Sequence, residues 1–274
     1  MDDVEGPAET PQEQKPGFAD RLRQALGGSS AHWGWWAAGL AVGVLGAMLA
    51  MRFVTPAEAT LPTGERAAME KLVKDTILDN PEIIPQAIDR LQTREVEKLL
   101  ASNREAIETP FAGAWAGNPD GDVVLVEFFD FNCPYCRQSS GDVERLLKED
   151  PNLKLVFRDM PVLGPDSERF ALAALSAAQQ GRYAAFYRNV FAGQGALSQE
   201  RLIRNTRAAG LDEAKVAAAL SSKELQAEVE KNVSLGRALG LTGTPSYVVG
   251  NKILSGAVGY EALKEAVEAA RKKS

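Results

Sequence analysis

The chain contains little histidine and little cysteine. Its 274 residues include one histidine, His32, and two cysteines, Cys133 and Cys136. A zinc site uses about four ligands, and His32 lies far from both thiols in the sequence, so we expect no metal and no cofactor. A scaffold held together by disulfides would need many more cysteines. The sequence therefore excludes a disulfide framework.

The chain also lacks an excess of basic residues. Its formal net charge is −6, its isoelectric point is near 5.1, and its lysines and arginines form no concentrated stripe. A phosphate-binding surface normally needs such a stripe, so we expect no nucleic acid partner. With 45% hydrophobic and 25% charged residues, the chain has the composition of a protein that can bury a full core.

Charged residues are absent from Trp33–Met51, WGWWAAGLAVGVLGAMLAM, which nearly reaches the roughly 20 residues of a membrane-spanning helix. We expect a single-pass anchor in the inner membrane, after a disordered cytoplasmic tail (1–32) and before a linker (52–62). Placing the rest of the chain in the periplasm relies on the thiol chemistry described below. The alternative is a signal peptide cleaved near Ala59, which would leave a soluble periplasmic protein.

Residues 63–108 are expected to form a helical stem. Apolar residues recur there at helical spacing, at Met69, Leu72, Val73 and Ile77. Asn80 and Pro81 supply the N-cap and first-turn proline of a second helix. So narrow a stem cannot bury its apolar face alone, and it must pack on the following domain or pair with other copies of itself. We expect self-association.

Residues 109–274 predict an α/β domain. The expected elements are a strand at Val123–Phe129 after the turn Asn118–Gly121, a helix at 137–149, a strand at Leu153–Phe157, a helical insert over about 166–239, a hairpin at Ser246–Val249 and Ile253–Ser255, and a closing helix at Tyr260–Arg271. The first strand, helix and second strand form a unit that favours parallel strands. We expect the aromatic group Phe186, Tyr187 and Phe191 in the core.

Cys133 and Cys136 lie between the exit of a predicted strand and the start of a predicted helix. Three readings compete: a metal site, a structural disulfide and a reactive dithiol. A disulfide closing so short a loop would restrain the unfolded chain only weakly, so we favour the reactive dithiol. The free N–H groups and dipole at the helix start favour a thiolate at Cys133, the expected nucleophile. Cys136 is expected to face the interior and to form the reversible disulfide with Cys133.

Four residues near the two cysteines in the sequence also have expected roles. Glu127 lies within an apolar strand, where an unpaired charge is costly, so it is either a paired core residue or the base that takes the proton of Cys136. We favour the base. Pro134 fits the first helical turn, and Tyr135 is expected to tune the thiolate and form the rim of the site. Asp130 is expected to be a loop or capping residue.

The segment FFDFNCPYC, the helical insert and Gly243-Thr244-Pro245 before a strand resemble the DsbA-like branch of thioredoxin-fold thiol-disulfide oxidoreductases. From about Glu65 onward the chain resembles the ScsC type, including the NPEI helix start and the GNPDGD turn. The resemblance implies a thioredoxin fold with a large helical insertion, and a cis Thr244–Pro245 peptide that exposes backbone groups to an extended substrate. From sequence alone, Pro245 is equally compatible with a trans turn.

Similar proteins with such stems are trimeric disulfide isomerases or reductants, kept reduced by a membrane partner. We therefore expect a membrane-anchored periplasmic homo-oligomer that acts on disulfides of exported proteins, with a membrane thiol-disulfide reductant or oxidant as partner. Two alternatives stay open. One is a monomeric dithiol oxidase of the same fold. The other is a non-catalytic anchored module, in which the cysteines close a tight loop and a groove beside Pro245 holds peptides.

Overall fold

The computed structural model describes Gly43 and residues 62–272. The expected tail (1–32), membrane span (33–51) and linker (52–62) lie outside the described residues, apart from Gly43 and Pro62. In the described part of the chain, no helix is both long enough and apolar enough to cross a membrane. The chain divides into two compact units after Asp79, so the helix that precedes this residue is described by itself.

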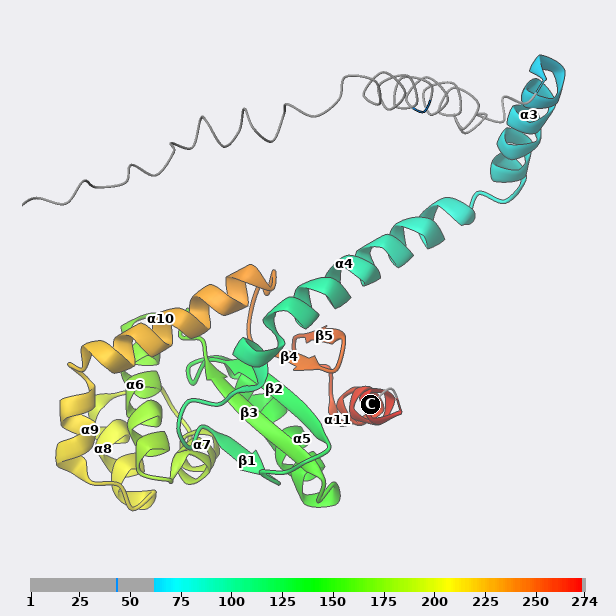
Figure 1. The fold of residues 1–274 in the computed structure, drawn as a ribbon. Coiled ribbons are helices and arrows are strands. Elements are labelled where there is room, and N and C mark those ends of the chain that lie inside the picture. The colour runs from blue at the N-terminus through cyan, green and yellow to red at the C-terminus, as the bar shows by residue number, and fades with distance from the viewer. Residues whose placement is uncertain (1–42, 44–61, 273–274) are drawn as a thin grey trace, which may run out of the picture. The chain divides into compact units, whose positions relative to one another are not determined.

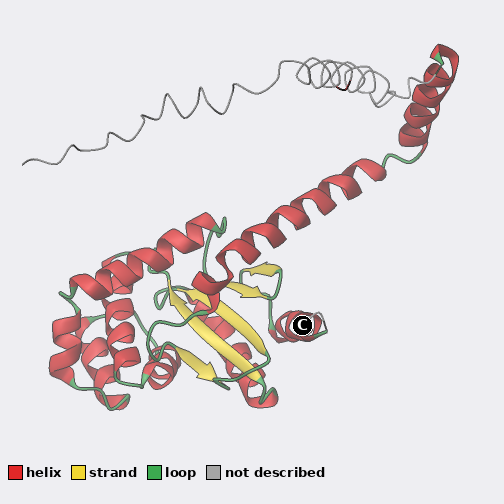
Figure 2. Ribbon diagram, viewed as in Figure 1, coloured by secondary structure: helices red, strands yellow, loops and turns green. Residues whose placement is uncertain are grey.

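Helices dominate the chain, and the strands lie together in one sheet (Figures 1 and 2). From the N-terminus the elements are α3 (Thr63–Asp79), α4 (Ile83–Glu108), β1 (Trp115–Gly117), β2 (Val123–Phe129), α5 (Pro134–Glu149), β3 (Leu153–Asp159), α6 (Pro165–Gln179), α7 (Tyr183–Ala192), α8 (Gln199–Ala208), α9 (Glu213–Ala219), α10 (Lys223–Ala238), β4 (Ser246–Val249), β5 (Lys252–Ser255) and α11 (Tyr260–Arg271). The expected helical insert is therefore five consecutive helices, α6 to α10.

The described strands form one five-stranded sheet in the order β1-β3-β2-β4-β5. The β2 and β3 strands are parallel, as their connection through α5 requires, and the other neighbours are antiparallel. Strand β1 was not anticipated, because a three-residue strand is too short to show a periodic pattern. A mixed sheet flanked by helices in this order is a thioredoxin-like α/β fold.

The two faces of the sheet bury different sets of helices. Successive residues of a strand point to opposite faces, so β2 sends Leu125, Glu127 and Phe129 to one face and Val126 and Phe128 to the other. The first face is covered by α5, α7 and α11, and the second by α4 and α10. Figure 1 shows α6 to α9 gathered at the left of the sheet, with α11 at its right. Glu127 and Cys136 therefore lie in the same layer of the core.

One predicted turn is confirmed, and one helix start is displaced. Asn118 accepts the backbone N–H of Gly121 and its side chain accepts that of Asp120, which forms the turn before β2. The helix expected to begin at Asn80-Pro81 begins instead at Ile83, because the backbone makes a tight turn first, with Ile83 N–H bonded to the carbonyl of Asn80.

Helix α4 changes character along its length. Its first half carries exposed apolar residues, whereas Leu100 and Ile107 in its second half are 1% exposed and pack on the sheet. Arg158 of β3, itself buried, donates hydrogen bonds to the carbonyls of Ala106, Ile107 and Thr109 at the end of the helix. These carbonyls have no partner within the helix, so Arg158 satisfies them and attaches α4 to the sheet.

Replacing Arg158 with methionine should destabilise the protein strongly. The change leaves the α4 carbonyls uncapped and removes the charge that faces Glu228, 3.5 Å away. Breaking a buried pair by removing one partner costs about 3 to 5 kcal/mol. We expect a loss of this size in the free energy of unfolding measured with urea.

The matched control is Arg104→Met. Arg104 also joins α4 to the sheet, through Asn251 in the β4–β5 turn, but its side chain is 41% exposed. An exposed pair contributes about 1 kcal/mol or less. Equal losses for the two variants would contradict the role given to Arg158.

Candidate active site

The two cysteines lie at the junction between β2 and α5. Strand β2 ends at Phe129, and Cys133 is the N-cap of α5, with extended backbone angles (φ −79°, ψ 121°). Pro134 occupies the first turn, where a missing N–H costs no helical hydrogen bond. The positive end of the helix dipole therefore lies at Cys133, as the sequence predicted.

The two cysteines differ in accessibility. Cys133 is 4% exposed, whereas Cys136, one turn further along, is fully buried. In the thiol form Cys133 Sγ donates a hydrogen bond to the carbonyl of Thr244, at 3.2 Å. Burial raises the pKa of Cys136, and the nearby charge of Glu127 raises it further. Cys133 is thus the less buried of the two thiols, and burial disfavours the loss of the proton of Cys136.

Glu127 lies at the centre of the covered face of the sheet. It is fully buried, and in the sheet register it stands between Phe157 on β3 and Tyr247 on β4. Tyr187 donates a hydrogen bond to Oε2 at 2.9 Å, and Tyr247 donates one to Oε1 at 3.2 Å. Burial raises the pKa of Glu127 to about 7, although both tyrosine bonds act in the opposite direction. A carboxyl group with this pKa takes up and releases protons near neutral pH.

Asp130 holds two loops together at the mouth of the site. It is 2% exposed, and its carboxylate accepts the backbone N–H groups of Asn132, Val162 and Leu163. The side chain of Asn132 donates in turn to the carbonyl of Leu163. Asp130 is thus a loop residue that accepts backbone N–H groups, in line with the predicted loop or capping role. The side chains of Val162 and Leu163, whose backbone groups these bonds hold, are exposed, as is that of Tyr135.

The Thr244–Pro245 peptide is cis, as the family resemblance implied. It directly precedes β4, and Pro245 accepts the backbone N–H of Gly256 at 2.8 Å. Because the carbonyl of Thr244 accepts the thiol of Cys133, this peptide lies next to the first cysteine of the pair. The structure thus brings Cys133 and Thr244 into contact although they are 111 residues apart in the sequence.

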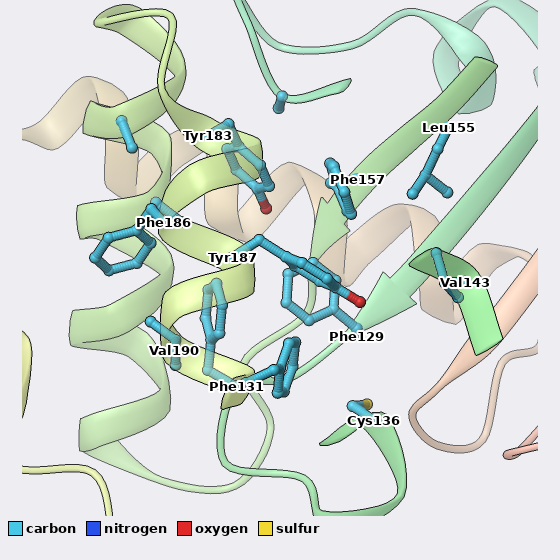
Figure 3. Close-up of a cluster of buried hydrophobic side chains, with 14 of the residues drawn as sticks. Phe129, Phe131, Cys136, Val143, Leu155, Phe157, Tyr183, Phe186, Tyr187 and Val190 are labelled. Atoms are coloured by element: carbon cyan, nitrogen blue, oxygen red, sulfur yellow. The ribbon is translucent and has the colours of Figure 1, made fainter. Parts of the chain in front are cut away.

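A second buried carboxyl group is bonded to Tyr183, one helical turn before Tyr187. Asp159, at the end of β3, accepts this hydrogen bond at 2.7 Å, and its other oxygen has no hydrogen-bond partner among the residues that the structure describes. Burial raises the pKa of Asp159 to about 8. Figure 3 shows Tyr183 and Tyr187 projecting from α7 into the same cluster of buried side chains, with Cys136 at its edge. Helix α7 therefore carries two tyrosines that serve two different carboxyl groups.

Three residues of this site were not assigned to it from the sequence: Ser139, Tyr187 and Tyr247. Tyr187 was placed in the core, where its ring does lie, but its hydroxyl serves Glu127. A carboxyl in an apolar strand requires hydrogen-bond donors, and buried tyrosines are natural candidates. Nothing in the sequence says which of them reach it. Within the described residues, no group of three or more His, Cys, Asp or Glu is placed to hold a metal ion.

The raised pKa of Glu127 predicts a pH-dependent stability. The folded protein holds this proton more tightly than the unfolded chain, in which the pKa of the Glu127 carboxyl group is 4.5. The resulting stabilisation is fully present below about pH 4.5 and is lost as the pH rises through about 7. Glu127→Gln carries no such proton. Its free energy of unfolding should therefore fall less between pH 5 and pH 8 than that of the wild type, by on the order of 2 to 3 kcal/mol.

Chemical denaturation of the reduced proteins at both pH values checks this. A residual decrease should persist in Glu127→Gln, since Asp159 contributes in the same direction. The exposed Glu105→Gln is the control and should follow the wild type. An unchanged pH dependence in Glu127→Gln would contradict a proton held at this carboxyl group.

Comparisons with known proteins agree with this geometry. The family model of the DSBA-like thioredoxin domain matches residues 124–268, and that of the copper resistance protein ScsC N-terminal domain matches residues 65–98. A thioredoxin-like oxidoreductase from Silicibacter pomeroyi DSS-3 is 40% identical and covers 63% of this chain and 99% of its own, with a TM-score of 0.60. ScsC from Proteus mirabilis, in a transitional conformation, is 28% identical and covers 78% of this chain and 100% of its own, with a TM-score of 0.61.

One curated relative is a much longer protein than this chain. The Na(+)/H(+) antiporter NhaA 1 from Salinispora arenicola is 27% identical over 234 residues, which cover 85% of this chain but 32% of the antiporter. The chain therefore spans about a third of the length of that relative. The match to the DSBA-like domain covers more than half of the chain and includes Glu127, both cysteines and Pro245. The chain thus belongs to the DsbA-like family of thiol-disulfide oxidoreductases, with an ScsC-type N-terminal segment.

Proposed function

We propose that this chain is a periplasmic, membrane-anchored disulfide isomerase or reductase that acts on exported proteins. The observation that carries the proposal is a pair of free thiols at a helix start, of which Cys133 keeps a small exposed fraction and Cys136 keeps none. Cys133 caps a helix beside Thr244, and Cys136 lies beneath it in the layer that holds Glu127. The anchor proposed for this function is Trp33–Met51.

The proposed reaction begins at Cys133. Its thiolate attacks one sulfur of a substrate disulfide, forming a mixed disulfide and releasing the other substrate sulfur as a thiolate. If that thiolate, or another in the substrate, attacks the mixed disulfide, the substrate disulfide is rearranged and Cys133 is regenerated. No electrons are consumed in this isomerisation.

Reduction of the substrate uses both cysteines. Cys136 transfers its proton to Glu127 and attacks Cys133 Sγ, which forms the Cys133–Cys136 disulfide and releases the substrate as a thiolate. Two electrons pass from the dithiol to the substrate. A membrane thiol-disulfide reductant must then supply two electrons to restore the dithiol, and we propose such a partner for this chain.

The stem supports a shared, oligomeric arrangement. Helix α3 exposes apolar side chains at Met69, Leu72, Val73 and Leu78, and the first half of α4 exposes Ile83, Ile84, Ile88 and Leu91. Apolar rows of this kind are covered in coiled coils by copies of the same helix. We propose a homo-oligomer, with a trimer as the expected form. Several dithiols on one stem raise the local concentration of reactive thiols at a bound substrate.

The monomeric dithiol oxidase is the runner-up. It uses the same residues with the electrons flowing in the opposite direction, so the site geometry does not distinguish it from a reductant. The non-catalytic peptide-binding module is less well supported, because a loop-closing role gives no reason to bury a carboxyl group beside Cys136.

A refolding experiment tests the isomerase proposal. A soluble form starting at residue 60 should accelerate recovery of active ribonuclease from its scrambled disulfide form, and Cys133→Ala should not. Cys136→Ser should retain part of the isomerisation, because rearrangement needs only the accessible thiol. It should lose the oxidation of fully reduced ribonuclease, which needs both. Recovery by the wild type no faster than by Cys133→Ala would exclude isomerase activity.

Sedimentation tests the oligomer. Combining Ile88→Glu with Leu91→Glu places two charges in the exposed apolar row of α4 and should reduce the sedimenting species to a monomer. The control Gln92→Glu adds a charge at an exposed polar position on the same helix and should leave the species unchanged. A wild type that already sediments as a monomer would favour the oxidase.

A further inference from the structure

The hydrogen bonds of Glu127 form a chain of buried groups drawn from three elements besides its own strand. Tyr187 of α7 donates to Oε2, and Tyr247 of β4 donates to Oε1. The hydroxyl of Tyr247 also lies 2.7 Å from Oγ of Ser139, on α5. All four side chains lie in residues that are 0 to 2% exposed. The helical insert, the active-site helix and the strand after Pro245 thus meet at one carboxyl group.

A count of protons shows that this series of hydrogen bonds can form with Glu127 either ionised or protonated. Tyr247 has one hydroxyl proton, so it donates either to Glu127 or to Ser139, but not to both. When Glu127 is ionised, its two oxygens accept from Tyr187 and Tyr247, and Ser139 donates to the oxygen of Tyr247. When Glu127 is protonated on Oε1, it donates to Tyr247, Tyr247 donates to Ser139, and Oε2 still accepts from Tyr187. Every polar atom keeps a partner in both states.

In the described part of the chain, hydroxyl groups are the hydrogen-bond partners of the Glu127 carboxyl oxygens. On α5 the titratable neighbour is Cys136, and on α7 Tyr183 lies one turn from Tyr187. Strand β3 presents Phe157 opposite Glu127, and α11 contributes apolar side chains to the same layer. Among the described residues, no arginine or lysine forms an ion pair with Glu127.

We propose that Tyr187, Tyr247 and Ser139 are positioning residues, which keep Glu127 hydrogen-bonded whether or not it carries a proton, so that it can take and return the proton of Cys136. The inference rests on the proposed function, because it concerns the step in which Cys136 resolves a mixed disulfide. A buried polar atom left without a partner costs about 1 to 3 kcal/mol. A carboxyl group that lost a partner at each proton transfer would therefore resist one of its two states.

Asp159 provides the contrast within the same core. It has one tyrosine donor, Tyr183, and within the described part of the chain its second oxygen has no hydrogen-bond partner. This carboxyl group has no hydroxyl chain whose direction can reverse. Tyr183 is therefore a matched control for Tyr187, since it has the same side chain, lies on the same helix and is bonded to a buried carboxyl group that serves no thiol.

The test follows the two thiols separately. The reduced full-length chain, kept in mild detergent, is mixed with excess dithiobis(nitrobenzoate) in a stopped-flow instrument. Cys133 attacks first, forming a mixed disulfide and releasing one coloured thionitrobenzoate. Cys136 then loses its proton, attacks Cys133 Sγ and releases the second. Two cysteines are oxidised and one reagent molecule is reduced, so the second phase reports the step that Glu127 assists.

The variants should shift the second phase in opposite directions. Tyr187→Phe and Tyr247→Phe each remove a donor to the ionised carboxylate, so the pH midpoint of the second phase should rise by about one unit. Ser139→Ala removes a partner of Tyr247 in both states, but only when Glu127 is protonated does this leave the Tyr247 O–H without an acceptor, which costs more than an unfilled lone pair, so the midpoint should fall. Tyr183→Phe should leave the midpoint unchanged. The first phase should be the same in all variants, which also verifies that each has folded.

The outcomes separate the two proposals. If the wild type shows no second release, the proposed function and this inference both fail. If it shows the release, the function stands, and midpoints that do not move in Tyr187→Phe and Tyr247→Phe overturn the inference. A shift of Ser139→Ala in the same direction as the tyrosine variants also overturns it, because a purely structural role predicts no reversal of sign.

Discussion

The burial of one carboxyl group beside one thiol constrains the rest of this active site. Glu127 lies in an apolar layer without an ion-pair partner among the described residues, so hydroxyl groups must satisfy it. Those hydroxyls come from α7 and β4, which are distant from β2 in the sequence and adjacent in the fold. Meeting this requirement joins the helical insert to the thioredoxin-like sheet at the point where Cys136 must lose a proton.

The different burial of the two cysteines follows from the position at which β2 ends. The strand carries Glu127 in the core and then delivers Cys133 to the start of α5, so the helix turn between Cys133 and Cys136 spans from the surface to the interior. Asp130 stabilises the mouth of the site by binding backbone groups on both sides of it. The cis peptide before β4 contacts Cys133, the less buried of the two thiols.

The two halves of helix α4 lie in different environments, one buried and one exposed. Its second half is part of the catalytic core, attached by Leu100, Ile107 and the carbonyl bonds of Arg158, whereas its first half exposes an apolar row. Helix α4 therefore exposes apolar side chains in its first half and packs on the sheet in its second half.

Much of this protein could be read from the sequence by itself. Local patterns gave the strand, the dithiol, the helix start, the long insert and the hairpin, because periodicity and turn residues act over a few positions. They could not give β1, which is too short, or the first turn of α4, where the backbone turned before the helix began. Only the tertiary structure decided which tyrosines reach Glu127 and that Arg158 caps α4, since those contacts join residues dozens of positions apart. A buried donor is identified by what lies across the core from it, and a linear sequence does not record that distance.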